Sequence, residues 1–342
     1  MSTQRGRIKI EGFHRDRPVD RDPEPSVHEE THDEIDQDVE SRWHRVARQI
    51  VRDRLALIGA VIVLLMVVSA IFSRPITALG VTLQPFSLAP FDPTSTGVGD
   101  PYQSPSLAHP MGTDRLGRDL LSRVMYGARF SVSIGLIVTV VAASFGVVYG
   151  GISGYFGGRV DDVLMRVVDM VFAFPGLVLA LVIIAMIGRG YWELVAAFAL
   201  PGWAIYARLI RGEILKVKQN EYVLAARALG ARDRTVLSRH VIPNAIAPVI
   251  VQATLSIGTV VIGVAALGFL GLGFTADTPE WGTMLEIERD TIVSAGGEWR
   301  WWATFFPGIM IFIFVMAMNM IGDAVNDALD AQTSGASQMG GG

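Results

Sequence analysis

The chain has 342 residues, of which 51% are hydrophobic and 18% are charged, and its mean hydropathy is +0.40. Soluble proteins carry about a quarter charged residues, so the composition indicates a membrane protein with some water-exposed segments. The sequence contains no cysteine, which excludes disulfides, zinc–thiolate sites, iron–sulfur clusters and a cysteine nucleophile. The net charge of −4 argues against a nucleic-acid partner, because such binding needs a basic surface.

The chain begins with an acidic stretch, residues 1–41, which holds 12 of the 33 acidic residues and six Lys and Arg. It lacks a periodic apolar pattern, so it cannot bury enough apolar surface to offset its ordering entropy. We predict a disordered acidic tail here. The polar N-terminus also argues against a cleaved secretory signal, so we expect the first apolar run to be retained as an anchor.

Residues 42–54 have a different pattern, in which Trp43, Val46 and Ile50 recur at helical spacing and five arginines fill other positions. A basic helix with one apolar stripe is typical of a membrane surface. We therefore predict a basic interfacial helix over 42–54. The alternative is a cytosolic extension of the helix that follows.

Six apolar segments are long enough to cross a bilayer, which needs about 20 residues of helix. They are Leu55–Phe72, Ser131–Ile152, Val163–Ile187, Trp192–Ile210, Ala245–Leu272 and Trp302–Ile321. The sequence therefore predicts an all-α membrane protein with a six-span domain over 55–325. Residues 326–342 are predicted to be a flexible C-terminal tail.

Lys and Arg in the short flanking segments predict the orientation, because such residues favour the cytoplasmic side. Arginines precede the first span, and seven Lys and Arg lie between residues 211 and 239. Six spans place these two regions on the same side of the membrane. We therefore expect a multi-pass protein of the prokaryotic plasma (inner) membrane, with cytoplasmic N- and C-termini and with loops 73–130 and 273–301 outside.

Motifs for nucleotide hydrolysis and for common hydrolases are missing from the sequence. It has no phosphate-binding loop, and neither a His-Glu-x-x-His nor a Gly-x-Ser-x-Gly motif. We expect neither a metal site nor enzymatic activity in this chain, so uphill transport needs an ion gradient or another subunit. A proton-coupled secondary transporter remains an alternative, with Asp169 as its ionisable residue inside a span. A structural scaffold would explain the spans but not the loop described next.

The loop between the fourth and fifth spans, residues 213–243, predicts a helical hairpin. Residues 221–229 favour a short helix, and Gly230 is typical of the positive φ that ends one. Residues 232–241 favour a second helix, which Pro243 is expected to end. The hairpin would expose an apolar knuckle with a basic rim, which indicates a partner. The alternative is a hairpin that lies on lipid.

This loop resembles the EAA motif of permease subunits of bacterial ATP-binding-cassette importers. The motif runs Glu-Ala-Ala, three residues, Gly, nine residues, Ile, one residue, Leu-Pro, and Ala225, Ala226, Gly230 and Pro243 match it in spacing. Leu224 occupies the place of the Glu, with Glu221 one turn earlier, and His240 occupies the place of the Ile. The resemblance implies an ATPase-coupling role for Glu221, Ala225, Ala226, Gly230, His240 and Pro243.

Three further stretches resemble the dipeptide/oligopeptide/nickel branch of these importers, and its C-type subunit. They begin at His109-Pro-Met-Gly-Thr-Asp, at Gly157-Gly-Arg-Val-Asp-Asp and at Thr278-Pro-Glu-Trp-Gly. The resemblance covers residues 45–325 and implies the type I importer (MetI-like) fold with a cytoplasmic coupling helix. It implies three kinds of partner besides the lipid bilayer: a homologous B-type permease, two ATPase subunits that use ATP and Mg, and an external solute-binding protein. Peptides are the expected cargo, with nickel or oligosaccharide as alternatives.

Other polar and aromatic residues have a structural and a functional interpretation. Asp162, Arg166 and Asp169 are spaced to pair along one helix, and they are also candidates for a pathway or gate. Glu280, Trp281 and Trp299 are candidates for contact with the binding protein, whereas tryptophans at such positions also form interfacial belts. Asp114 or Asp119 is expected to cap a helix. Glycines 146, 150, 154 and 158 share one helix face and predict close helix packing.

Overall fold

The computed structural model describes residues 48–78, 81–84, 86–289 and 300–339. Every described residue belongs to one unit, Val46–Gly342. The predicted acidic tail 1–41 therefore lies outside the described residues, as do residues 42–47 of the predicted interfacial helix. Residues 48–52 of that helix are helical.

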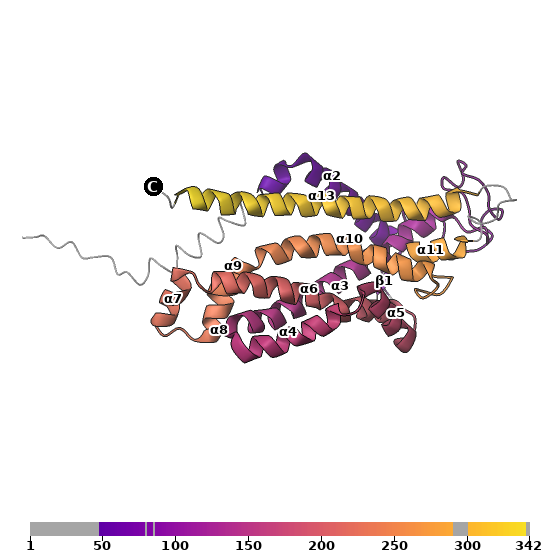
Figure 1. Ribbon diagram of the computed structural model, residues 1–342. Helices are drawn as coiled ribbons and strands as arrows, with labels where there is room; N and C mark the ends of the chain where they lie inside the picture. The colour runs from indigo at the N-terminus through magenta and orange to yellow at the C-terminus, as the bar shows by residue number, and fades with distance from the viewer. Residues whose placement is uncertain (1–47, 79–80, 85, 290–299, 340–342) are drawn as a thin grey trace, which may run out of the picture. The chain divides into compact units, whose positions relative to one another are not determined.

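The described residues form helices and a pair of short antiparallel strands (Figure 1). In chain order the elements are α2 (Arg54–Phe72), β1 (Ile76–Ala78), β2 (Val81–Gln84), α3 (Leu120–Phe156), α4 (Gly158–Phe172), α5 (Gly176–Ile187), α6 (Tyr191–Val217), α7 (Glu221–Ala228), α8 (Asp233–Thr235), the π-helix η1 (Val236–Val241), α9 (Ile242–Ala245), α10 (Ala247–Phe269), α11 (Trp281–Ile287) and α13 (Trp302–Met339). Helices α2, α3, α6, α10 and α13 are each long and apolar enough to cross a membrane.

Helices α4 and α5 meet at a bend of 83°, and the pair taken together is long and apolar enough for a sixth crossing. The predicted continuous span Val163–Ile187 is therefore wrong in detail. Pro175 causes the break, because its ring disfavours helical backbone at the preceding residue and it has no N–H to donate. Pro175 takes the extended conformation that precedes α5, with φ −58° and ψ 127°.

Helices α3 and α6 pack closely along a row of glycines on α3. A β-carbon built on Gly146 would lie 2.6 Å from the carbonyl oxygen of Trp203, and one on Gly150 would overlap that of Ala207. These contacts confirm the predicted close packing. Gly158 is an exception, since it begins α4 with φ +52° and has no neighbour within 4 Å.

The order of contacts along this seam shows that α3 and α6 run parallel. Gly146, Gly150 and Gly154 face Trp203, Ala207 and Arg211 respectively. Parallel neighbours need a connection that returns across the whole bundle, so residues 157–190 make one full crossing. The arrangement agrees with the six predicted crossings, as five long helices and one bent pair.

Helices α7–α9 lie at one end of this unit, together with the start of α2 and the end of α13 (Figure 1). We call this the hairpin end. The opposite end carries β1, α11 and the segment 86–119, and we call it the loop end. Helix α13 continues to Met339, so residues 326–339, which the sequence assigns to a flexible tail, are helical.

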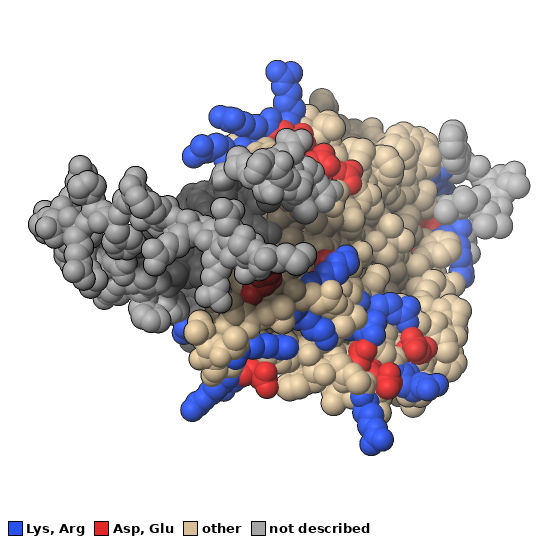
Figure 2. All heavy atoms as spheres, turned by 60° about the vertical axis from the view of Figure 1, so that its left-hand side comes forward, with Lys and Arg blue, Asp and Glu red and all other residues tan. Residues whose placement is uncertain are grey.

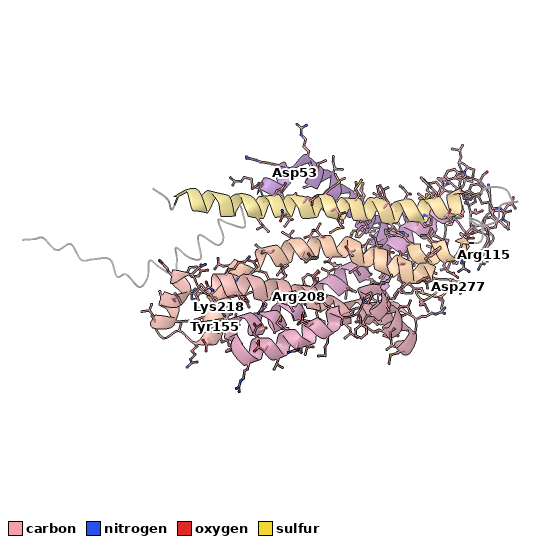
Figure 3. The ribbon with its side chains drawn as sticks, in the orientation of Figure 1. Asp53, Arg115, Tyr155, Arg208, Lys218 and Asp277 are labelled. Atoms are coloured by element: carbon pink, nitrogen blue, oxygen red, sulfur yellow. The ribbon has the colours of Figure 1, made fainter. Side chains whose placement is uncertain are left out.

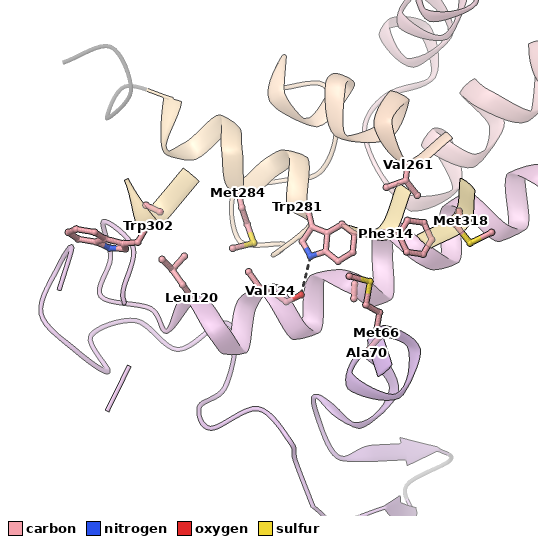
Figure 4. Packing of buried hydrophobic residues seen from close by; sticks show 12 residues of the cluster. Met66, Ala70, Leu120, Val124, Val261, Trp281, Met284, Trp302, Phe314 and Met318 are labelled. Carbon is pink, nitrogen blue, oxygen red and sulfur yellow. Dashed lines mark hydrogen bonds between the residues drawn. The ribbon is translucent and has the colours of Figure 1, made fainter. Parts of the chain in front are cut away.

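The core near the loop end is built around Trp281, which is fully buried (Figure 4). Its Nε1 donates a hydrogen bond to the carbonyl oxygen of Val124 in α3 at 3.0 Å. Leu120 and Phe314 belong to the same buried cluster. Helix α3 begins directly at Asp119, whose carboxylate accepts from the Ser122 amide, so the predicted amphipathic outer helix and the second span form one continuous helix.

Candidate functional site

The helical hairpin that follows α6 is the strongest candidate for a functional site. Helix α7 ends at Ala228, and Gly230 turns the chain with φ +82°. The amide of Ala231 donates to the carbonyl of Ala226 at 3.1 Å, which satisfies an orphan group at the helix end. The predicted first helix and its glycine terminator are confirmed.

The second arm of the hairpin differs from the expected single helix over 232–241. It consists of the single turn α8, the π-helix η1 and the short helix α9. Pro243 does not end this arm, because it lies in the first turn of α9, where a missing N–H is tolerated.

One face of the hairpin is seated on the bundle by aliphatic side chains. Val223, Val236 and Val241 are fully buried and pack with Ile214 of α6. Burial of such side chains stabilises a contact by about 1.5–3 kcal/mol each. The hairpin is therefore held against the ends of the long helices.

The opposite face of α7 exposes large apolar side chains. Leu229 is 85% exposed, and Tyr222 and Leu224 are also exposed. We call these three residues the docking face. Clustered apolar residues in a water-exposed loop indicate a binding surface, so the predicted apolar knuckle is present.

The residues that match the coupling motif all lie on this hairpin. Glu221 begins α7 and is exposed, Ala225 and Ala226 follow in its middle, and Gly230 forms the turn. His240 lies in η1, where its carbonyl accepts from the Asn244 side chain at 2.8 Å. Together with Pro243 in α9, these residues are brought together as the sequence suggested, and their roles remain predictions.

Basic side chains surround the docking face. Arg232, Arg234 and Arg239 are exposed on the second arm. Figure 2 looks toward this end of the molecule and shows Lys and Arg side chains gathered over it. The hairpin thus presents an apolar surface within a positively charged rim.

The candidate pathway residues Asp162, Arg166 and Asp169 are all exposed on α4. Asp169 accepts from Nη2 of Arg208 on α6 at 2.6 Å. The predicted pairing along α4 is therefore wrong for Asp169, because α4 packs against α6 and presents its acids to arginines there. Figure 3 labels Arg208 near the middle of the bundle.

Sequence reasoning missed a second pair between these two helices. Asp161 is buried, and it accepts from Nε of Arg211 at 2.9 Å and from the hydroxyl of Ser153. Two arginines three residues apart at the end of an apolar span, Arg208 and Arg211, were the available signal. Their acidic partners lie on a different helix, so spacing did not identify them.

Two of the three candidate contacts with a binding protein, Glu280 and Trp281, are buried. Glu280 is 1% exposed and Trp281 is fully buried, while Trp299 lies outside the described residues. Glu280 accepts from the amides of Gly282 and Thr283 at the start of α11 and from the hydroxyl of Ser131. The predicted contact role is wrong for Glu280 and Trp281 in this structure, and the interfacial-belt interpretation is also wrong for Trp281.

Charged groups at the loop end fasten segment 86–119 to the helices. Asp119 pairs with His109 at 2.9 Å and caps α3, which confirms that capping prediction.

Burial raises the pKa of the Glu288 carboxyl group, next to α11. Burial and the nearby Glu288 carboxylate also raise the pKa of Tyr102 to about 12.

Within the described part of the chain, no group of three or more His, Asp or Glu side chains is placed to hold a metal ion.

Comparison with known proteins gives matches over most of the chain. Residues 146–335 match the family described as "Binding-protein-dependent transport system inner membrane component". Residues 41–105 match "N-terminal TM domain of oligopeptide transport permease C".

Among curated proteins, the glutathione transport system permease protein GsiD of Escherichia coli O6:K15:H31 is 38% identical over 298 residues, 87% of this chain and 93% of that protein. The GsiD protein of Shigella boydii serotype 4 matches with the same identity and coverage. A solved amino acid ABC transporter is 22% identical and covers 59% of this chain and 94% of its own, but its TM-score of 0.39 is too low to support a structural argument.

Proposed function

We propose that this chain, which belongs to the family of binding-protein-dependent transport system inner membrane components, carries short peptides inward across the membrane. It is a permease of the peptide and glutathione type of ATP-binding-cassette importer. It would form half of the translocation pathway, and a homologous second permease would form the other half. The family consists of transport permeases, and we propose that this chain itself hydrolyses nothing. ATP and Mg would be used by two separate ATPase subunits.

The observation that carries this proposal is the docking face of Tyr222, Leu224 and Leu229. It is apolar, rimmed by arginines and fixed on its other side to α6 through Val223. A helix of this kind fits a cleft of a soluble partner, where the apolar residues lose their contact with water. The partner proposed for it is an ATPase subunit.

The proposed mechanism follows from this attachment. Binding of ATP closes the two ATPase subunits, and each docked hairpin moves with the subunit that holds it. Because the hairpin is packed on the spans, the spans are displaced toward the outward-facing state, and hydrolysis resets them. A solute-binding protein would deliver the substrate at the loop end.

The proposed sidedness places the hairpin end in the cytoplasm. Arg48, Arg52 and Arg54 lie beside the first span, and further basic residues surround the hairpin. Short flanks rich in Lys and Arg favour the cytoplasmic side. Both termini of the chain would then be cytoplasmic.

The proposed substrate class is supported by the names of the relatives, which are described as glutathione permeases. Glutathione is a tripeptide, so a di- or tripeptide is the first choice for this chain. Nickel or oligosaccharide remains the alternative cargo, and selection among them would depend on the binding protein.

Replacement of Leu229 by Asp tests the docking proposal. A carboxylate cannot be buried in an apolar cleft without a large desolvation cost, so the amount of ATPase that co-purifies with the permease is expected to fall about tenfold or more. Leu116→Asp is the matched control, because Leu116 is exposed at the loop end. Equal ATPase recovery with Leu229→Asp and with the unaltered chain would contradict the proposal.

Replacement of Gly230 by Val is expected to abolish ATP-dependent uptake while the protein still inserts into the membrane. The positive φ of Gly230 is strained for other residues by about 1–2 kcal/mol, and no neighbour lies within 4 Å, so the effect is confined to the turn. Uptake of radiolabelled glutathione and of an alanine tripeptide measures the result, and the amount of protein in the membrane fraction measures insertion. Gly176→Val serves as control, since Gly176 is equally open but has no positive φ. Full uptake by Gly230→Val argues against a coupling role for this turn.

A further inference from the structure

The side chain of Tyr155 lies between the two arms of the hairpin. Its hydroxyl donates to Oδ1 of Asp233, at the start of the second arm, at 2.6 Å. The guanidinium of Arg227, in the last turn of α7, lies over its ring at 4.7 Å from the centroid. Tyr155 is only 4% exposed. One residue of α3 therefore contacts both arms.

The same turn of α3 is tied to its neighbours on the other side. The hydroxyl of Ser153 donates to Asp161 of α4, which also accepts from Arg211 of α6. Nζ of Lys218, just after α6, donates to the carbonyl of Gly154 at 2.8 Å, and Figure 3 labels Lys218 and Tyr155 at this end. These bonds bind the inner ends of α3, α4 and α6 into one block.

Helix α3 extends from this block toward the loop end without a break. Its 37 residues correspond to a length of about 55 Å at the usual rise per residue. Near its far end it accepts the hydrogen bond from Trp281. A rigid helix with fixed contacts at both ends transmits a displacement between them.

Two kinds of contact hold the hairpin on the bundle. The aliphatic contacts of Val223, Val236 and Val241 are non-directional, so they seat the hairpin without fixing its angle. The hydrogen bond from Tyr155 and the stacking of Arg227 depend on orientation. The Tyr155 contacts join α3 to both arms of the hairpin and depend on their orientation.

We propose that Tyr155 is the positioning residue that makes α3 move together with the hairpin when bound ATPase subunits displace it. This inference rests on the proposed function. It goes beyond docking, because it identifies where motion passes from the hairpin into the membrane-spanning bundle. Asp233 is the hydrogen-bond partner that holds the ring in place.

A distance measurement tests the proposal directly, since the chain has no native cysteine. Spin labels on cysteines introduced at Val148 in α3 and at Ser238 in η1, both exposed, report the separation between helix and hairpin. The complete importer is measured before and after ATP with vanadate, with the partner subunits free of reactive thiols. With Tyr155 present, the distance is expected to stay the same. With Tyr155→Phe, the distance distribution shifts and broadens when nucleotide binds, while the ATPases stay bound.

Substitutions at Asp233 separate the hydrogen bond from a general structural role. Asp233→Asn keeps an oxygen that accepts from Tyr155 and is expected to behave like the unaltered chain, whereas Asp233→Ala behaves like Tyr155→Phe. Tyr149→Phe is the matched control, because it removes a hydroxyl of α3 that bonds to the Leu164 carbonyl and not to the hairpin.

Three results would overturn this inference and leave the proposed function intact. The distance between the two spin labels changes with nucleotide in the unaltered chain, or it does not change in Tyr155→Phe. In the third, the ATPase subunits are lost from Tyr155→Phe but not from the unaltered chain. Loss of ATPases from the unaltered chain overturns the proposed function and this inference with it.

Discussion

Replacement of Gly150 by Ala is expected to destabilise the protein by about 3 kcal/mol, although it adds a single methyl group. A β-carbon at this position would overlap the carbonyl oxygen of Ala207 and lie 2.7 Å from its carbonyl carbon. These are backbone atoms of α6, so no rotamer change relieves the overlap. The two helices would have to separate along the seam that contains Gly146 and Gly154.

The adjacent glycine provides a matched control for this prediction. A β-carbon on Gly151 would meet only the ends of Ile214 and Ile242, at 3.8 and 3.9 Å, which is ordinary contact. Alanine also favours a helix over glycine by up to about 1 kcal/mol, so Gly151→Ala is expected to be neutral or slightly stabilising. Unfolding of both variants in mixed micelles, followed by circular dichroism, gives the free energies. Equal stabilities for the two variants would show that the seam is not as close as described.

Replacement of Glu280 by Ala is the second change with a large expected effect, a loss of about 2–4 kcal/mol of stability. The carboxylate caps α11 by accepting from Gly282 and Thr283, and it also accepts from Ser131 at 3.1 Å. Alanine would leave these buried donors without an acceptor, and unsatisfied buried groups are costly.

Two further variants define the cause of that loss. Glu280→Gln keeps an acceptor oxygen and is expected to recover a large part of the stability. Glu286→Ala removes a carboxylate from the same short helix at a partly exposed position and is expected to change stability by less than about 0.5 kcal/mol. Thermal unfolding in detergent checks all three. If Glu280→Ala keeps its stability and loses only affinity for a binding protein, then the surface role first expected from the sequence would be correct.

The spans show what hydrophobicity alone predicts. The sequence predicts the first span at Leu55–Phe72, and the structure has it at Arg54–Phe72. The agreement is close because a continuous apolar run of this length between polar flanks crosses a bilayer as a single helix. The third span is not predicted correctly, because hydrophobicity alone does not predict the helix break that Pro175 causes. The continuation of α13 to Met339 was also missed, since its last residues are polar and lack an apolar stripe.

The candidate site was predicted where its signal is local. The helix before Gly230 and its positive φ follow from neighbouring residues, and the structure confirms them. The burial of Glu280 and the pairing of Asp161 with Arg211 depend on residues distant in the sequence. A single sequence carries no information about such contacts, so it predicts neither the burial of Glu280 nor the pairing of Asp161.

The parallel arrangement of α3 and α6 has a consequence for how the protein is made. Neighbouring spans can pair as soon as both have left the ribosome, but the glycine face of α3 has its partner on a span that is synthesised two crossings later. Gly150 must therefore remain in contact with lipid or with a temporary neighbour until the bent α4–α5 crossing has been inserted and α6 has followed. Insertion and assembly are thus separate events for this seam, and chains that stop before Tyr191 will leave it open.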